Sequence, residues 1–414
     1  MATTSLDPAF WSRFRRRYWE RRGLVLRQPL RTALAAPDEA FGWLVGAGER
    51  FRAGDRSVVP EFFIEHAQVL ADVARYLPRA RDRSMDGYAH RITRMIGGRR
   101  FGLVIDDFQA QAPELWLRLR EFLRGLYAVT GIPGEQAKAT LFLGNYRSTP
   151  FGLHRGRSGN FMFVVHGRKH IRAWPHRFFR GKEDMTNRLD YGRYNSASMV
   201  FSAAPGDVIY WPSDYWHIGE DAGGLSVAIS LALFMTPDVA GDVARNVERL
   251  VRAHGDGRRR AGPFPLRPDD RRASAAVGAA ARRSARDLTT VSREVETTLA
   301  GAWLNHLTGY GFGRVPAPAP PRQLRPGTVI RGCPQDPIRV VAARDGALVC
   351  SANGHAFSVT GHPKLSALLE QLNSGAPCRV GDLMTTYSGR ASRAGIRAIL
   401  EKLHSLRAVS DGSA

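Results

Sequence analysis

The sequence predicts a mainly β protein with helical decoration, followed by a small α+β module. Three observations carry this prediction. Short β-rich runs that Gly and Pro interrupt fill residues 139–235, which is the pattern of a β-sandwich or barrel. Apolar residues before this region recur at helical spacing. After a Pro-rich stretch at 315–327, the tight-turn dipeptides Asp345-Gly346 and Asn353-Gly354 separate three further short runs.

The part before residue 139 is predicted to be mostly helical. Five aromatic side chains share helical spacing within residues 8–21, and a later amphipathic run opens with Pro and Glu, as helices often do. The predicted elements are a helix within 8–21, a strand at Leu24–Leu26, helix over most of 38–80 with an extended break around Ser57–Pro60, a strand at Phe101–Ile105 and a helix at Pro113–Val129.

The β-rich middle is predicted to contain six strands. They are Thr140–Leu143, Asn160–Val165, His170–Trp174, Ser198–Phe201, Val208–Trp211 and Leu225–Phe234. A helix at about 237–253 follows, and then a Gly/Pro/Arg/Ala-rich stretch that we interpret as linker or partly helical surface.

The C-terminal part is predicted to form a winged-helix-like module. The predicted elements are a three-stranded meander of Ile338–Ala343, Ala347–Ser351 and His355–Thr360, and helices at Pro363–Leu372, Val380–Thr386 and Ser392–Leu406. We therefore expect a first domain at 1–255, a linker at 256–328 with a helix at about 288–307 and the Pro-rich segment, and a winged-helix-like domain at 329–414.

The composition excludes several classes of protein. With 43% hydrophobic residues, the chain is not wholly disordered. No stretch of about 18 uncharged apolar residues is present, which excludes a membrane span. The first residues lack an apolar signal core, so we expect a cytoplasmic protein. The three cysteines are too few for a disulfide framework and lack metal-site spacing.

The formal net charge is +22, yet only five of the 60 basic residues are lysines. The arginines are spread along the whole length, so we interpret the charge as a global arginine bias. A nucleic acid or an acidic partner remains an alternative. Because lysine is rare, a lysine at a position that chemistry requires is informative.

Two histidines lie where strands of the β-rich region begin or end. His154 comes just before an alternating run, and His217 comes just after a run that Pro212 ends. Neutral imidazole is the commonest protein ligand for metals, and histidines at the mouths of two strands can bind one ion. By spacing alone the evidence is weak, and two structural histidines are the alternative.

These segments resemble the Jumonji C and related cupin-like oxygenases, which use Fe(II), 2-oxoglutarate and O2 on a double-stranded β-helix. The run Ser148-Thr149-Pro150-Phe151-Gly152-Leu153 resembles the family's approach to its first iron ligand, here His154. The distal motif is matched by Gly206-Asp207, Pro212, Trp216 and His217. The resemblance covers about residues 8–240, and residues 329–410 loosely.

The resemblance implies a cosubstrate site beside the iron. Asn160 and Lys169 follow His154 by six and fifteen residues, the spacing of the oxoglutarate contacts in the asparaginyl hydroxylase of hypoxia signalling. The implied site residues are His154 and His217 for iron and Lys169, Asn160, Thr149, Tyr146 and Ser230 for 2-oxoglutarate. A fixed cation such as Lys169 suits the distal carboxylate of the dianion. The alternatives are a surface role for Lys169, a strand-edge role for Asn160 and core packing for Ser230.

The two ends of the chain resemble the bacterial ribosomal-protein hydroxylases in particular. The N-terminal aromatic run followed by Leu24–Leu26 is similar to theirs, and they too carry a C-terminal winged helix. Small-molecule oxygenases do not need such a module, so the resemblance implies a peptide or protein substrate. In those hydroxylases the module serves oligomer or substrate contacts, which leaves a homodimer open. The modest charge of 392–406 favours protein contact over nucleic acid.

One position departs from the family pattern. The carboxylate ligand of the iron belongs at position 156, where this chain has Gly156. Three outcomes stay open. Water or another carboxylate (Asp214, Glu220 or Asp190) completes an oxygenase site. Alternatively, the vacancy accepts chloride, as in oxoglutarate halogenases with a His-x-Gly or His-x-Ala motif. In the third outcome, metal affinity is too low for turnover, and the domain is an inactive cupin that binds a peptide or a nucleic acid.

Overall fold

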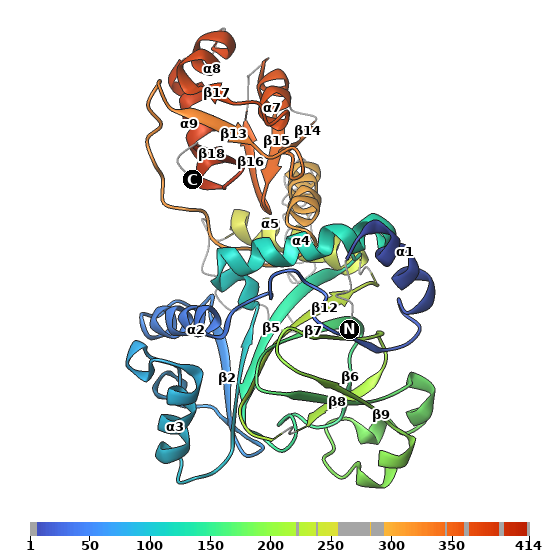
Figure 1. The fold of residues 1–414 in the computed structure, drawn as a ribbon. Coiled ribbons are helices and arrows are strands. Elements are labelled where there is room, and N and C mark those ends of the chain that lie inside the picture. Colours follow the sequence, from blue (N-terminus) through green and yellow to red (C-terminus); the bar gives the residue numbers. More distant parts are fainter. Residues whose placement is uncertain are drawn as a thin grey trace, which may run out of the picture. The chain divides into compact units, whose positions relative to one another are not determined.

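The structure of the chain is a computed structural model that describes residues 6–220, 223–236, 239–255, 282, 294–343, 346–359, 364–388 and 393–411. The chain divides into two compact units (Figure 1). Unit 1 comprises Met1–Pro237 and Tyr310–Ala317, and unit 2 comprises Asp238–Gly309 and Pro318–Ala414.

Unit 1 is built on two antiparallel sheets. The larger sheet has the strand order β1-β10-β7-β12-β5-β4-β2-β3, and the smaller has the order β6-β11-β8-β9. The strands of the larger sheet are β1 (Leu24–Leu26), β2 (Val59–Ile64), β3 (Ala67–Val69), β4 (Phe101–Asp106), β5 (Gln136–Gly144), β7 (Ser158–His166), β10 (Val208–Trp211) and β12 (Ser226–Phe234). Those of the smaller sheet are β6 (His154–Arg155), β8 (Lys169–Trp174), β9 (Met199–Ala203) and β11 (Trp216–Glu220).

Strand β7 shows why the larger sheet lies between two layers. Alternate side chains of a strand point to opposite faces. Phe161 and Phe163 belong to the core formed with the helices, whereas Met162 and Val164 belong to a second core with residues of the smaller sheet. Burial on both faces makes this strand a continuous apolar run instead of an alternating one.

Helices cover the outer face of the larger sheet. The N-terminal helix α1 (Pro8–Arg17) begins at Asp7, whose carboxylate accepts a hydrogen bond from the Phe10 N–H, and it packs against α4 (Pro113–Thr130). Phe122 of α4 contacts Phe161 and Phe163 edge-on, with ring centroids 5.1 Å apart in both pairs. Helices α2 (Pro37–Arg52) and α3 (Met85–Met95) complete the N-terminal decoration (Figure 1).

Most predicted strands and helices of unit 1 are confirmed, but residues 38–80 are not mostly helical. The helix ends at Arg52, and β2 and β3 form a hairpin beyond it. The extended break expected near Ser57–Pro60 is the start of β2, whose Phe62 is fully buried and whose six residues pair with β4. The helix α3, capped by the Ser84 hydroxyl, and the strand β11 were not predicted.

Unit 2 contains two small sheets and several helices. The predicted meander is confirmed by β14 (Arg339–Ala342), β15 (Leu348–Ala352) and β16 (His355–Val359). Asn353 and Gly354 turn the second hairpin with φ of 51° and 79°, a conformation these residues tolerate. A second sheet has the order β17-β13-β18, and the other elements are α5 (Val239–Gly255), a helix at 294–308, β13 (Val329–Gly332), α7 (Leu365–Asn373), β17 (Cys378–Arg379), α8 (Val380–Tyr387), α9 (Arg393–Ser405) and β18 (Val409–Asp411).

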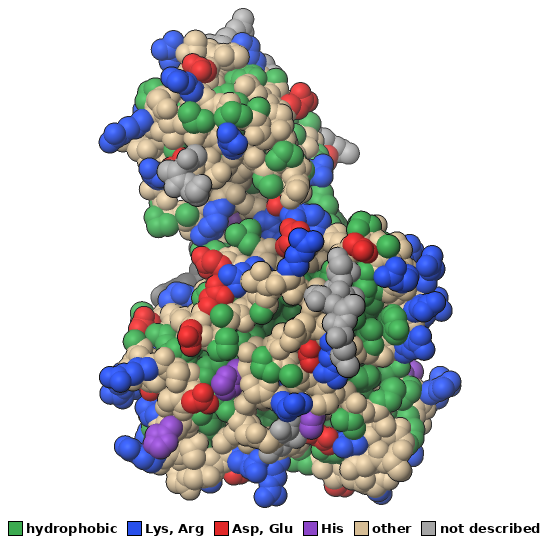
Figure 2. Space-filling model, viewed as in Figure 1, with side chains coloured by type: hydrophobic (Ala, Val, Ile, Leu, Met, Phe, Trp, Pro, Cys, Tyr) green, Lys and Arg blue, Asp and Glu red, His purple; other side chains and the backbone are tan. Residues whose placement is uncertain are grey.

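Three sequence predictions concern residues that the structure does not fully describe. Outside the described residues lie the arginine-rich stretch interpreted as linker, the first residues of the predicted helix at 288–307 and the Asp345 turn position. Within the described part of the chain, no helix has the length and apolarity that crossing a membrane requires. Figure 2 shows basic side chains scattered over the visible face among carboxylates, as a global arginine bias predicts.

Candidate metal and cosubstrate site

The fold brings His154 and His217 together. The two residues are direct cross-strand partners of β6 and β11 in the smaller sheet. Their ring centroids lie 4.2 Å apart, with an angle of 59° between the ring planes. Antiparallel pairing of two short strands therefore places two imidazoles from distant parts of the sequence side by side.

Each imidazole is held in the same tautomer by its own backbone. The Nδ1 atom of His154 lies 3.0 Å from the Gly152 carbonyl oxygen, and Nδ1 of His217 lies 3.0 Å from the Tyr215 carbonyl oxygen. A carbonyl oxygen can only accept, so Nδ1 carries the proton in both rings and Nε2 keeps its lone pair. Such an outer hydrogen bond is typical of histidines that ligate a metal.

Burial favours the neutral form of both rings. It lowers the pKa of His154, and it lowers the pKa of His217 further because the neighbouring His154 also disfavours a second positive charge. Neutral imidazole is the form that binds a metal ion.

Position 156 lies beside His217. A Cβ atom added to Gly156 would lie 3.7 Å from Cε1 of His217 and 3.5 Å from Oγ of Ser158, which are ordinary contact distances. The Gly156 carbonyl oxygen accepts a hydrogen bond of 2.9 Å from the Asp214 N–H. The structure thus has room for a side chain at the position where the family pattern has a carboxylate.

The three candidate replacement carboxylates are engaged elsewhere. Asp214 pairs with Arg155 at 3.8 Å, and Asp190 with Arg188 at 3.1 Å. Glu220 pairs with Arg172 at 2.7 Å and accepts a hydrogen bond of 2.8 Å from the Tyr191 hydroxyl. In the described ranges, no group of three or more His, Cys, Asp or Glu side chains is arranged to hold a metal. The centre consists of two imidazoles.

Lys169 is a buried cation close to this centre. Only 1% of the residue is exposed, its Nζ donates a hydrogen bond to the Tyr146 hydroxyl, and Nζ lies 4.5 Å from the centroid of the Tyr146 ring. Among the residues that the structure describes, no carboxylate lies within 4.0 Å of Nζ. A buried charge without a counter-ion is costly, so this position favours an anionic ligand.

Gly219 lets Thr149 approach Lys169. A Cβ at position 219 would lie 2.8 Å from Cγ2 of Thr149 and 3.6 Å from Cε of Lys169, so a larger residue would displace the threonine. The two backbones are tied by the hydrogen bond from the Thr149 N–H to the Gly219 carbonyl oxygen, at 2.8 Å. The Thr149 hydroxyl accepts a weaker bond of 3.3 Å from the Gly219 N–H.

Asn160 and Ser230 are joined on the larger sheet. The Ser230 hydroxyl donates a hydrogen bond of 3.2 Å to Oδ1 of Asn160, and Nδ2 of Asn160 donates to the Ser158 carbonyl oxygen at 2.8 Å. Both residues are buried. Asn160 is paired with β10 on one side and with β12 on the other, so it is not at a strand edge, and both residues line a cavity.

The cavity has a volume of about 230 Å³ and lies between the two sheets. Its lining includes the predicted His154, His217, Lys169, Asn160, Thr149 and Ser230, together with Gly156. Tyr146 is not among the lining residues and reaches the cavity through Lys169. The remaining lining residues are Thr140, Phe142, Phe151, Ser158, Met162, Ile171, Trp211, Gly219 and Phe234.

Two of the lining residues that sequence reasoning missed have polar groups near the centre. Ser158 could have been found from the period of two, because Gly156, Ser158 and Asn160 alternate along one face. Trp211 has its ring centroid 4.9 Å from that of His217, and its buried Nε1 has no hydrogen-bond partner within the described part of the chain. No sequence signal distinguished this tryptophan from an ordinary core residue.

The N-terminal segment holds the loop before His217. The Glu20 carboxylate accepts hydrogen bonds from the Ser213 hydroxyl and from the Ser213 N–H, the latter at 3.1 Å. The Glu20 N–H donates to the Tyr210 hydroxyl at 2.8 Å. This loop carries the Tyr215 carbonyl that fixes the His217 tautomer, so Glu20 supports the centre from outside the cavity.

Comparison with known proteins relates the fold to one group of enzymes. No family model matches the chain, and no curated protein matches its sequence. Solved structures of YcfD, a ribosomal oxygenase from Escherichia coli, match it over 97% of this chain and 98% of theirs, at 14% identity. The TM-scores are 0.50 for the complex with cobalt and succinic acid, 0.50 for the complex with cobalt and 2-oxoglutarate and 0.51 for a further structure. The chain has a ribosomal-oxygenase fold.

Proposed function

We propose that this protein is an Fe(II)- and 2-oxoglutarate-dependent oxygenase that hydroxylates a side chain of a peptide or protein in the cytoplasm. The observation that carries the proposal is the pair His154 and His217. Both rings line one cavity and carry their protons on Nδ1, so each Nε2 is available for a metal, and the buried Lys169 lines the same cavity.

The residues present fit the metal and its cosubstrate. His154 and His217 would hold the iron through Nε2, while Lys169 would bind the distal carboxylate of 2-oxoglutarate, with Thr149, Asn160, Ser230 and Tyr146 in support. When bound, the iron and cosubstrate supply the oxidation of a C–H bond by O2 coupled to decarboxylation of 2-oxoglutarate to succinate. The chain's own residues orient the dianion and exclude bulk water.

The comparisons support the cofactor and the substrate class. YcfD has been solved with cobalt and with either 2-oxoglutarate or succinic acid, and it is a ribosomal oxygenase. We further propose that unit 1 forms a double-stranded β-helix, that residues 1–255 make up the oxygenase domain, and that residues 329–414 are a winged-helix domain that contacts the substrate or a second copy of the chain.

Chloride binding beside the iron is the second candidate. The space at Gly156 next to His217 favours it, because a halide could occupy the position that a carboxylate would otherwise fill. The protein would then chlorinate its substrate and would need chloride for product formation. Water at the same position gives the hydroxylase.

Cobalt titration and succinate formation test the proposal together. Purified protein is expected to bind Co(II) with a visible absorption spectrum and to release succinate from 2-oxoglutarate in the presence of Fe(II). His154→Ala should abolish both. His90→Ala is the matched control, since His90 is exposed and lies outside the cavity lining. Absence of both cobalt binding and succinate in the unaltered protein would show that the domain is a binding scaffold.

A further inference from the structure

A second pocket of unit 1 is lined almost entirely by arginine. It has a volume of about 650 Å³, and its lining residues are Arg75, Arg79, Arg81, Arg91, Arg94 and Met95. They come from the turns before α3 and from the second half of α3 itself. The pocket shares no lining residue with the histidine cavity.

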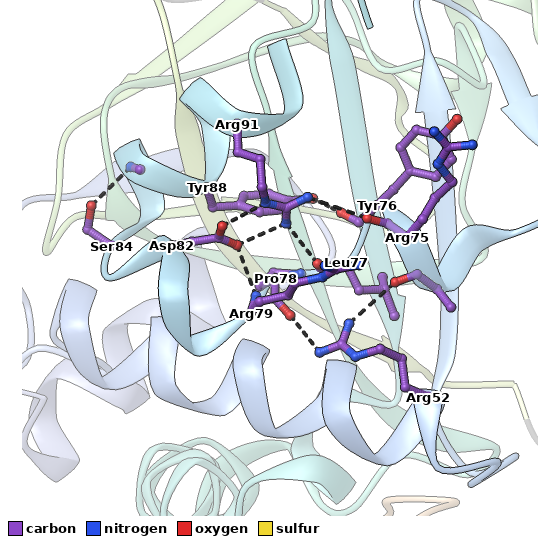
Figure 3. A network of polar contacts seen from close by, with 12 residues as sticks. Arg52, Arg75, Tyr76, Leu77, Pro78, Arg79, Asp82, Ser84, Tyr88 and Arg91 are labelled. Atoms are coloured by element: carbon purple, nitrogen blue, oxygen red, sulfur yellow. Dashed lines mark hydrogen bonds and ion pairs between the residues drawn. The ribbon is translucent and has the colours of Figure 1, made fainter. Parts of the chain in front are cut away.

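One buried carboxylate organises the pocket from beneath. The side chain of Asp82 is 2% exposed and accepts two hydrogen bonds from Arg91, of 2.6 Å from Nε and 2.9 Å from Nη2. It also accepts a bond of 2.9 Å from the Arg79 N–H (Figure 3). Asp82 therefore fixes both the guanidinium of Arg91 and the backbone of the turn.

Two arginines clamp the same segment through its carbonyl oxygens. Nη2 of Arg91 donates to the Leu77 carbonyl at 3.0 Å, and Nη2 of Arg52 donates to the Pro78 carbonyl at 3.0 Å from the side of α2 (Figure 3). The segment that carries Arg75 and Arg79 is thus held on both sides. Because this segment is already held in place, less conformational entropy is lost when an anion binds.

The other four guanidinium groups of the pocket have no counter-ion among the described residues. Within the described residues, no carboxylate lies within 4.0 Å of Arg75, Arg79, Arg81 or Arg94. The buried Nε of Arg79 has no hydrogen-bond partner there either. Burial lowers the pKa of Arg79, and the nearby charges of Arg81, Arg91 and Arg52 lower it further. Positive charge is therefore concentrated in this pocket beyond what Asp82 compensates.

We propose that this arginine pocket binds a phosphate group. Guanidinium groups match phosphate oxygens in pairs, and a phosphate offers several charged oxygens to forks that approach from different directions. A single carboxylate carries one charge and would leave most of the four uncompensated arginines without a partner. The phosphate can belong to a free phosphorylated molecule or to the backbone of an RNA strand.

Two probes distinguish these sources in the full-length protein. Inorganic pyrophosphate is titrated by calorimetry, and a fluorescein-labelled single-stranded RNA of about 12 nucleotides by fluorescence polarisation. The test variant is Arg81→Gln/Arg94→Gln, which removes two exposed pocket cations. The control is Arg13→Gln/Arg16→Gln, which removes the same charge from the exposed surface of α1. We expect the test variant to weaken binding about tenfold or more and the control less than about twofold.

The two probes and the two double variants distinguish a free phosphorylated ligand, an RNA backbone and general charge attraction. Pyrophosphate binding that the test variant weakens, with no RNA binding, supports a free phosphorylated ligand. RNA binding that pyrophosphate displaces, and that falls steeply with salt, supports the backbone. Equal losses of affinity in both double variants would show general charge attraction and would overturn the proposal. Hexaglutamate that binds as tightly as pyrophosphate would also overturn it, and so would the absence of binding by either probe. Arg75→Gln, a single exposed change, repeats the test should the double variant have a lowered melting temperature.

Discussion

His154 and His217 face each other across β6 and β11, and each donates its Nδ1 proton to the carbonyl oxygen two residues earlier in its own strand region. The arrangement is symmetric in chemistry although the two segments are unrelated in sequence. Both Nε2 atoms are therefore left as acceptors or ligands, and no side chain has to move to set the tautomers.

Replacing Gly156 with aspartate should strengthen the metal site. The added Cβ would meet its neighbours at 3.5 Å or more, and no left-handed φ is involved, so an aspartate fits beside His217 without rearranging the backbone. We expect Co(II) affinity to rise by about one to two orders of magnitude. Gly42→Asp, on α2 with no heavy atom near its Cβ, is the control.

The same variant decides between hydroxylation and chlorination. A carboxylate at position 156 should raise substrate hydroxylation if water fills the position, and should abolish chlorination if chloride does. Product analysis by mass spectrometry with and without chloride measures both. A Gly156→Asp protein that binds cobalt more weakly than the unaltered protein would contradict our placement of this residue beside the metal.

Replacing Lys169 with methionine should remove cosubstrate binding but not the fold. A hydrogen-bonded charge on the distal carboxylate is worth roughly one to two orders of magnitude in affinity, so the Kd of 2-oxoglutarate should rise by that factor. Because Lys169 has no carboxylate partner among the described residues, the ligand-free variant should melt at or above the temperature of the unaltered protein.

Lys138→Met is the matched control for this change. Lys138 lies on β5 and pairs with Asp106 at 2.5 Å, outside the cavity lining. Its replacement should leave the Kd of 2-oxoglutarate unchanged while removing an ion pair. An unchanged Kd in Lys169→Met, measured by calorimetry with Co(II) present, would exclude Lys169 as the cosubstrate anchor.

Replacing Glu20 with glutamine should loosen the metal site from a distance. The carboxylate holds Ser213 through two hydrogen bonds, and the loop in turn presents the Tyr215 carbonyl to His217. We expect Co(II) affinity to fall about tenfold, as for the loss of an outer partner of a metal ligand. The visible spectrum of the cobalt protein should broaden while the Kd of 2-oxoglutarate changes little. Glu49→Gln, on α2, provides the comparison.

Replacing Asp82 with asparagine should destabilise unit 1 in a pH-dependent way. Burial alone would raise the pKa of Asp82, but hydrogen bonds from Arg91 and the Arg79 N–H outweigh it, so the net pKa is lowered. A lowered folded-state pKa stabilises the protein above the unfolded pKa of about 3.9 and loses that effect as the pH falls through the folded value. We expect a loss of about 3–5 kcal/mol at pH 7, because a buried pair is broken.

The difference from the unaltered protein should shrink below about pH 4, because the Asp82 carboxyl of the unfolded chain is protonated there before that of the folded protein, whose pKa is lower. Urea unfolding at pH 7 and at pH 3.5 measures it. Asp190→Asn, which breaks an exposed pair with Arg188, should cost less than about 1 kcal/mol at either pH. A constant difference across this range would show that the Asp82 charge is not what stabilises the turn.

Strands with clear patterns could be predicted from the sequence, and strands without them could not. The runs of β10 and β12 are apolar and bounded by Gly or Pro, and their positions are confirmed. Strand β11 carries His217 and Gly219 and has a single β-branched residue, Ile218, so its sequence showed no clear strand pattern. The β2–β3 hairpin was missed because we predicted helix to continue beyond α2. The six residues of β2 form a strand because they pair with β4, a contact between distant segments that local sequence does not indicate.

The histidines could be found because the motifs around them resemble those of a known family, whereas their surroundings depend on contacts between distant segments. Tyr146 meets Lys169 because its ring lies over Gly102 and Gly144, where an added Cβ would come within 3.2 and 2.6 Å of the ring. Nothing local in the sequence indicates such an approach. The arginine pocket was equally hidden, because in a chain with a general arginine bias only the fold shows which arginines converge.

The contact between Glu20 and Ser213 limits how far the chain could be shortened from its N-terminal side without loss of support for the histidine pair. Every side chain that lines the histidine cavity lies after residue 139, so a shortened chain that begins at β1 would keep all of them. It would nevertheless lose Glu20, whose carboxylate accepts hydrogen bonds from the Ser213 N–H. Efforts to shorten this protein for engineering should therefore trim other regions first and leave the N-terminal segment that carries Glu20 in place.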